Sequence, residues 1–141
     1  MLGAYGFLRA LFEIFERHRT AVDVVTTSEV SVSLSLDDAG TLPMIVPELE
    51  RLGAVELEER RTIISVIGEG LRNTPGIAAR VFSTISDINV SMISVGASSI
   101  NLTFMVDEPR APEAIRRLHR VFFEAEASEN RIDRAVEEVL A

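Results

Sequence analysis

Apolar side chains in the first part of the chain switch between two spacings. Phe7, Leu11 and Phe15 recur at every fourth position, which is the spacing of an amphipathic helix. Val32 and Leu34 instead alternate with serines that would form a solvated or sheet-packing face, the pattern of a half-buried strand. In chain order these patterns predict a helix at 5–18, a β-branched strand at 21–27, a strand at 30–36, a helix at 42–52 ended by Gly53, and a strand at 55–58.

The rest of the chain predicts the same order of elements with a strand added in front. Residues 62–67 form a continuous apolar run, which Gly68 and Gly70 break. Pro75 suits the first position of a helix, and Asn73 or Thr74 can cap it. The expected elements are a strand at 61–67, a helix from Pro75 to Ile85, strands at 88–95 and 100–106, and a helix at 110–122.

The two parts of the chain also match each other as sequences. A shift of 70 positions places Gly6 on Gly76 and aligns the strand predicted at 30–36 with the strand predicted at 100–106. Between these blocks the shift is 68, which puts Ser91 where the first part has Asp23. The sequence therefore predicts one structural unit used twice, with a small loop difference inside it.

The predicted order is β-α-β-β-α-β, so the expected fold class is α+β, with two ferredoxin-like units in tandem. The first unit, 1–59, lacks its first strand, and the second, 60–124, lacks a clear final strand. Incomplete sheets leave exposed edges, so we expect part of a longer polypeptide that self-associates as a two-fold homodimer. In the tail, 125–141, apolar residues spaced four apart predict a short helix.

Composition narrows the class of function. A hydrophobic content of 47% supports a real core. The net charge of −8 argues against a nucleic-acid partner, because phosphate binding needs a positive field. The chain has no cysteine, no apolar run of membrane-spanning length and no signal peptide, so we expect a cytoplasmic protein without a membrane partner.

Residues that could support catalysis are sparse. The chain carries no phosphate-binding glycine motif, no zinc-binding histidine motif and no serine-nucleophile motif. Its two histidines, His18 and His119, lie beside arginines in stretches typical of an exposed helix surface. We therefore predict no catalytic residue, no metal site and a function based on binding.

Two motifs at a fixed interval resemble the regulatory end of aspartate kinases. The first combines Gly6-Phe7-Leu8-Arg9-Ala10-Leu11-Phe12 with Val22-Asp23 and Thr26-Thr27-Ser28-Glu29-Val30-Ser31, and the second combines Thr74-Pro75-Gly76-Ile77 with Gly96-Ala97-Ser98-Ser99-Ile100-Asn101. In that family the kinase domain is followed by two ACT modules, ferredoxin-like units that bind end-product amino acids. The resemblance covers residues 1–124. It implies a regulatory piece without cofactors of its own, since ATP and Mg²⁺ would belong to the kinase domain.

The resemblance also implies a site for a free amino acid at a subunit interface. Backbone N–H groups at residues 3–8, where the first helix begins, would receive the carboxylate, and Asp23 would receive an amine. Ser28 and Glu29 match the same pocket in lysine-responsive members, and the two acidic groups favour lysine over threonine. Ala4 stands where relatives have a small hydroxyl residue. The implied ligand residues are Met1, Ala4, Phe7, Leu8, Val22, Asp23, Ser28 and Glu29.

Two classes of function stay open at this point. In the first, the chain is an allosteric sensor that binds L-lysine, or threonine, and biases the kinase domain of the same protein in feedback inhibition of the aspartate pathway. In the second, the ACT-like units only hold subunits together and bind no small molecule. The second unit has Ser91 at the position of Asp23, so we expect it to serve assembly rather than lysine binding.

Overall fold

The computed structural model describes residues 5–96 and 98–124, which form two compact units divided between Glu59 and Arg60. The predictions for Met1, Ala4 and the tail at 125–141 therefore lie outside the described residues. Each unit has a hydrophobic core of its own. None of the described helices is long and apolar enough to cross a lipid bilayer.

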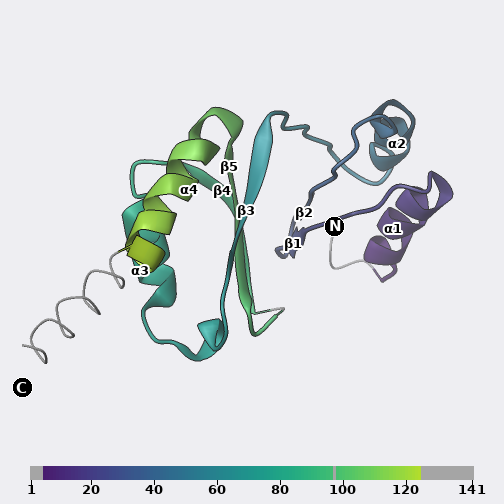
Figure 1. Ribbon diagram of the computed structural model, residues 1–141. Helices are drawn as coiled ribbons and strands as arrows, with labels where there is room; N and C mark the ends of the chain where they lie inside the picture. The colour runs from purple at the N-terminus through teal and green to yellow at the C-terminus, as the bar shows by residue number, and fades with distance from the viewer. Residues whose placement is uncertain (1–4, 97, 125–141) are drawn as a thin grey trace, which may run out of the picture. The chain divides into compact units, whose positions relative to one another are not determined.

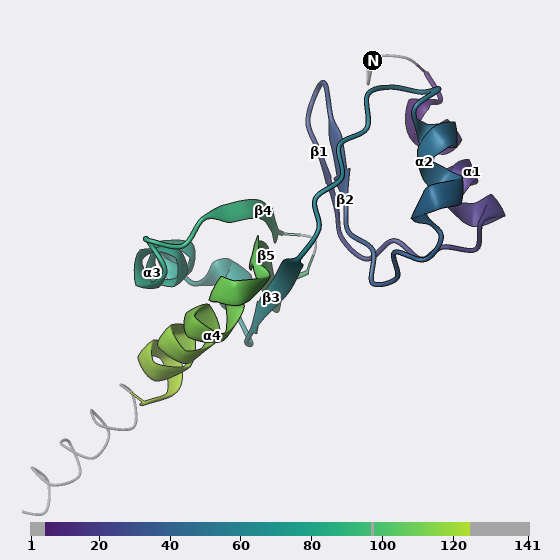
Figure 2. The ribbon, with the colours of Figure 1, turned by 90° about the horizontal axis from the view of Figure 1, so that it is seen from above.

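Unit 1 is a β-hairpin covered by two helices. Its elements are α1 (Phe7–Arg17), β1 (Val25–Thr27), β2 (Val32–Leu34) and α2 (Leu42–Leu49). The strands pair antiparallel, with Val25 opposite Leu34 and Thr27 opposite Val32. Figure 2 shows both helices on the same side of the hairpin.

The core of unit 1 comes chiefly from α1. Leu11, Ile14 and Phe15 are buried, and α2 adds Ile45, which is inaccessible to solvent. The half-buried side chains that pack against them are Val22, Val32, Leu34, Leu36, Leu49 and Leu52. An isolated two-stranded hairpin is marginally stable at best in water. The apolar surface that the hairpin and the two helices bury together therefore stabilises all four elements.

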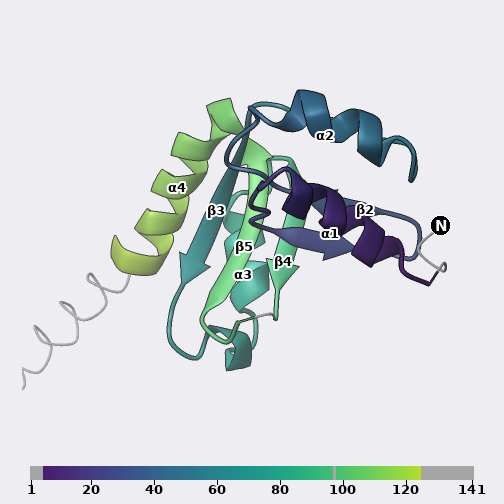
Figure 3. The ribbon, with the colours of Figure 1, turned by 90° about the vertical axis from the view of Figure 1, so that its right-hand side faces the viewer.

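Unit 2 is a three-stranded antiparallel sheet with two helices on one face (Figures 1 and 3). Its elements are β3 (Arg61–Ile67), η1 (Leu71–Asn73), α3 (Ile77–Thr84), β4 (Val90–Val95), β5 (Asn101–Asp107), η2 (Glu108–Arg110), α4 (Ala111–His119) and η3 (Arg120–Glu124). The strand order is β3-β5-β4, so β5 lies in the centre. Within the described part of the chain, the outer edge of β3 pairs with no strand.

The central strand β5 supplies the middle of the core of unit 2. Leu102 and Phe104 are almost inaccessible to solvent, and Val81 of α3 and Ala114 of α4 belong to the same buried cluster. Phe82 meets Phe104 edge to face, with ring centroids 5.6 Å apart. Val81 and Phe82 of α3 therefore face the sheet.

The internal repeat is visible in the backbone. Gly6 and Gly76 are aligned by the shift of 70. Both adopt a left-handed conformation, with φ of 84° and 80°, immediately before α1 and α3. In each case the glycine carbonyl accepts the N–H four residues further on at 2.9 Å. A side chain would be strained at either position, because other residues rarely adopt this φ.

One strand predicted for unit 1 is absent, and another is shorter than predicted. Residues 55–58 form no strand, because β1 and β2 pair with each other and no third strand lies beside them in the described part of unit 1. The ladder of β1 begins at Val25 instead of residue 21, because a bulge at Asp23 and Val24 interrupts the regular pairing.

The predicted cap of the first helix in unit 2 is also wrong. Neither Asn73 nor Thr74 caps α3, which begins at Ile77 after the left-handed Gly76. The Thr74 hydroxyl donates instead to the carbonyl of Gly70 at 3.0 Å. The glycine turn has taken the place of a side-chain cap.

Candidate functional site

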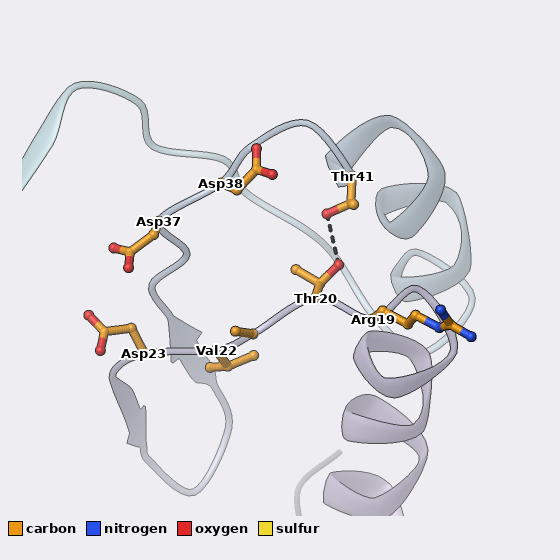
Figure 4. Close-up of a pocket in the computed structure, with 8 residues that line it drawn as sticks. Arg19, Thr20, Val22, Asp23, Asp37, Asp38 and Thr41 are labelled. Atoms are coloured by element: carbon orange, nitrogen blue, oxygen red, sulfur yellow. Dashed lines mark hydrogen bonds between the residues drawn. The ribbon is translucent and has the colours of Figure 1, made fainter.

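A cavity of about 340 Å³ opens in unit 1 (Figure 4). Its wall comes from the link between α1 and β1, the stretch after β2, and the residue before α2. The lining residues are Arg19, Thr20, Ala21, Val22, Asp23, Asp37, Asp38 and Thr41. Three of the four charged residues in this wall are acidic, so the cavity favours a cationic group over an anionic one.

Asp23 lies at an irregularity in the pairing of the hairpin. The Asp23 N–H donates to the carbonyl of Ser35 at 3.0 Å, and the Ser35 N–H donates to the carbonyl of Val24 at 2.9 Å. Two residues of one strand therefore oppose one residue of the other, which is the pattern of a β-bulge. The Val24 N–H donates to the Ser35 hydroxyl at 2.9 Å, so the backbone donors of the bulge are satisfied.

The bulge brings Asp23 to the cavity. Val22 packs on the core of unit 1, and Val25 lies opposite Leu34, which packs on the same core. Val25 itself is 38% exposed, but its pairing places it on the face of the hairpin that Val22 shares. Residues three apart face opposite sides of a regular strand, so one extra residue is needed to put both valines on the same face. Asp23 is exposed, and its carboxylate has no hydrogen-bond or ion-pair partner among the described residues. Asp37 lines the same cavity, and Figure 4 shows its carboxylate in the same part of the wall.

Side-chain contacts hold the other parts of the cavity wall. Thr20 Oγ1 lies 2.9 Å from Thr41 Oγ1, which joins the segment after α1 to the start of α2. Asp38 Oδ1 accepts the N–H of Gly40 at 2.8 Å in a turn within the loop after β2. Figure 4 shows the Arg19 side chain directed away from the carboxylates, so it does not neutralise them.

Next to the cavity, His18 and Arg17 join the end of α1 to α2. His18 Nε2 lies 2.7 Å from Glu48 Oε1, and Arg17 Nη2 lies 2.6 Å from Glu48 Oε2. The hydrogen bond from His18, together with the charge of Arg17, holds the pKa of the Glu48 carboxyl below its ordinary value. The His18 side chain is only 19% exposed, so the prediction of an exposed surface histidine is wrong at this position. Its partner lies 30 residues away in the sequence, where no local pattern reveals it.

Of the predicted ligand residues, Val22 and Asp23 line the cavity, whereas Ser28 and Glu29 do not. Ser28 shapes the hairpin turn, where its hydroxyl accepts two backbone N–H groups, and Glu29 is exposed in that turn. Ser28 is five residue steps along the extended chain from Asp23, a distance of roughly 16 Å. One amino acid is too short to bridge that distance within a single chain.

Phe7 and Leu8 begin α1 at the same end of unit 1 as the hairpin turn (Figures 2 and 3). Phe7 is half-buried and Leu8 is 41% exposed, so neither belongs to the fully buried core. The predicted residues thus form two groups in one chain: a cavity end, with Val22 and Asp23, and a turn end, with Phe7, Leu8, Ser28 and Glu29.

The sequence reasoning did not assign Asp37, Asp38 or Thr41 to a site. The two aspartates follow the strand predicted at 30–36, and aspartate is too common in loops to indicate a site by itself. Only the pairing of β1 with β2 brings the residues after β2 beside the residues before β1. No group of His, Asp and Glu side chains within 5–96 and 98–124 has the arrangement to hold a metal ion.

Comparison with known proteins identifies relatives of this chain. The family model of the ACT domain matches residues 64–122. The chain is 39% identical to lysine-sensitive aspartokinase 3 of Escherichia coli over 88% of this chain and 29% of that protein. It is 42% identical to chloroplastic aspartokinase 2 of Arabidopsis thaliana over 89% of this chain and 25% of that protein. The chain spans about a quarter of the length of the curated relatives it matches.

Solved structures agree with these relatives. E. coli aspartokinase III in complex with lysine and aspartate, in the T-state, matches with a TM-score of 0.76 and 40% identity over 87% of this chain and 29% of that one. A structure assigned as the C-terminal regulatory domain of aspartate kinase from Porphyromonas gingivalis W83 matches with a TM-score of 0.75. That match has 36% identity and covers 84% of this chain and 81% of that domain. Because most of a regulatory domain is covered at this identity, the chain belongs to the aspartate kinase family, as a regulatory region built from ACT-type units.

Proposed function

We propose that this chain is the amino-acid sensor of an aspartate kinase and that its ligand is L-lysine. The name of the E. coli relative and its complex with lysine support the choice of ligand. The observation that carries the proposal is the Asp23 carboxylate, which is exposed on the cavity wall without a partner among the described residues. Such a carboxylate is available to an ammonium group, and lysine offers two.

The charge of the cavity supports lysine over threonine or leucine. Asp23, Asp37 and Asp38 contribute negative charge, and the Arg19 side chain is directed away from them. The α-ammonium of any amino acid could meet one carboxylate. The second ammonium of lysine adds a further attraction that a neutral side chain lacks.

We further propose that two copies of the chain share the complete site. The cavity end and the turn end of one hairpin lie too far apart to contact one amino acid. Two hairpins related by a two-fold axis can run in opposite directions, which would bring Asp23 of one copy close to Ser28 and Glu29 of the other. Backbone N–H groups at the start of α1 would then receive the ligand carboxylate.

In the full-length protein we expect lysine to favour an inactive state of the kinase. The kinase domain would hold ATP, Mg²⁺ and the catalytic residues, and this chain alone would phosphorylate nothing. A ligand shifts an equilibrium only by its difference in affinity for the two states. Lysine must therefore bind the inactive arrangement of these units more tightly than the active one.

Calorimetric titration of the 141-residue chain with L-lysine, L-threonine and L-leucine tests the ligand. We expect lysine to bind most tightly. Asp23→Ala should weaken lysine binding by about 1.5–3 kcal/mol, or roughly 10- to 150-fold in Kd, the scale of a charge-assisted hydrogen bond. Glu56→Gln is the matched control, because it removes an exposed charge outside the cavity.

Each other result points to a different function. Equal affinity for the three amino acids would contradict the charge argument. Binding of threonine without lysine would indicate a threonine-responsive regulator. No heat with any of the three would favour a constitutive assembly module.

A further inference from the structure

The bulge at Asp23 recurs in unit 2. Strand β4 pairs with β5 on either side of Ser91, which remains as an extra residue between Val90 and Met92. The internal repeat aligns Ser91 with Asp23. The extra residue therefore occupies the same place in both units, which makes the bulge a feature of the fold and not a local defect.

The residue opposite the bulge differs between the two units. In unit 1 it is Ser35, and the repeat places Met105 there in unit 2. Ser35 is only 7% exposed. Its N–H, its carbonyl and its hydroxyl each bind one of the two bulge residues, Asp23 and Val24. Methionine has no hydroxyl, so the side-chain hydrogen bond is particular to the unit that carries the acidic residue.

We infer that Ser35 is a positioning residue for the ligand. The bulge itself forms without a hydroxyl in unit 2, and in unit 1 the buried Ser35 hydroxyl holds the Asp23–Val24 peptide within it, which directs the Asp23 carboxylate to the cavity. The inference rests on the proposed function, in which Asp23 binds an ammonium group. Without the hydroxyl, the Val24 N–H loses its acceptor, and the bulge is free to shift toward another one. Such a shift moves Asp23, whose carboxylate no other described residue holds.

The test compares variants of Ser35 in the full 141-residue chain, with L-lysine as the probe. Ser35→Thr keeps the hydroxyl and adds a methyl group. Ser35→Val has nearly the same shape as the threonine variant but carries a methyl group in place of the hydroxyl. We expect the lysine Kd to rise about tenfold or more in S35V and less than about threefold in S35T. Ser35→Ala adds no volume and should behave like S35V. Ser33→Ala, at an exposed position of the same strand, is the control.

A double-mutant cycle separates positioning from a general loss of structure. If Ser35 acts through Asp23, adding S35V to Asp23→Ala should reduce the affinity for lysine little further. A purely structural defect would lower the affinity by the same factor in both backgrounds. Hydrogen exchange of the Val24 amide, followed by NMR, should become faster in S35V and S35A and stay slow in S35T.

The outcomes distinguish the inference from the function on which it rests. Lysine binding that S35V and S35A leave unchanged would overturn the positioning role and leave lysine sensing intact. Additive losses in the cycle would overturn it as well. No lysine binding by the unaltered chain would refute the proposed function, and the ligand role of Ser35 with it.

Discussion

Ile45 packs α2 against the rest of unit 1. It is the buried residue that α2 contributes, and it belongs to one cluster with Leu11, Ile14 and Phe15 of α1. Ile45→Ala removes three carbon atoms from a site with no solvent exposure. We expect a loss of about 3 kcal/mol in the free energy of unfolding, whereas Ile45→Val, which removes one methyl group, should cost about 1 kcal/mol.

The same substitution should also affect the cavity. Thr41 lines the cavity immediately before α2, and its Oγ1 lies 2.9 Å from Thr20 Oγ1. Loosening α2 should therefore weaken lysine binding, but by a smaller factor than Asp23→Ala. The reason is that Asp23 lies on the hairpin side of the cavity, where its backbone N–H still donates to the carbonyl of Ser35.

Urea unfolding followed by far-UV circular dichroism measures the cost, since the chain contains no tryptophan. Ile115→Ala is the matched control, because Ile115 is 51% exposed on α4 and its loss should change stability by no more than about 0.5 kcal/mol. Equal losses at the two positions would refute the argument that burial decides the cost. A loss below about 1 kcal/mol for Ile45→Ala would show that this core does not hold unit 1 together.

Self-association, acid stability and ligand distribution offer three more tests. Light scattering at micromolar concentration should give about twice the 15.5 kDa of one chain; a monomer with and without lysine would contradict the shared site. The hydrogen bond from Arg117, assisted by Arg110, lowers the pKa of Asp87 from 3.8 to about 2. Its stabilising effect is therefore present above about pH 4 and lost as the pH falls toward 2. Asp87→Asn should reduce the acid dependence of the unfolding free energy in that range, and an unchanged dependence would count against this ion-pair network. Crystals soaked in lysine should show it in unit 1 and not in unit 2, where Ser91 offers no charge; equal occupancy would be inconsistent with that reading.

Local periodicity in the sequence determined the helices and most of the strands. The helical spacing in α1 and the serine alternation around β2 both appear in the structure, because side-chain direction follows directly from backbone geometry. The alignment of Gly6 with Gly76 identified two copies of one unit, and both glycines have the same left-handed backbone. The motif around Asp23 was specific enough to identify the family, since it combines polar residues at fixed places in the chain.

Only the tertiary structure decided what surrounds Asp23. The pairing of β1 with β2 places Asp37 in the wall of the same cavity, and the bulge held by Ser35 shifts the alternation of side chains by one residue. Pairing and bulges depend on contacts between distant segments, so a local pattern does not reveal them. The same reason applies to Glu48, the partner of His18 across 30 residues. Packing of α1 against α2, and not any pattern within either helix, brings these two side chains together.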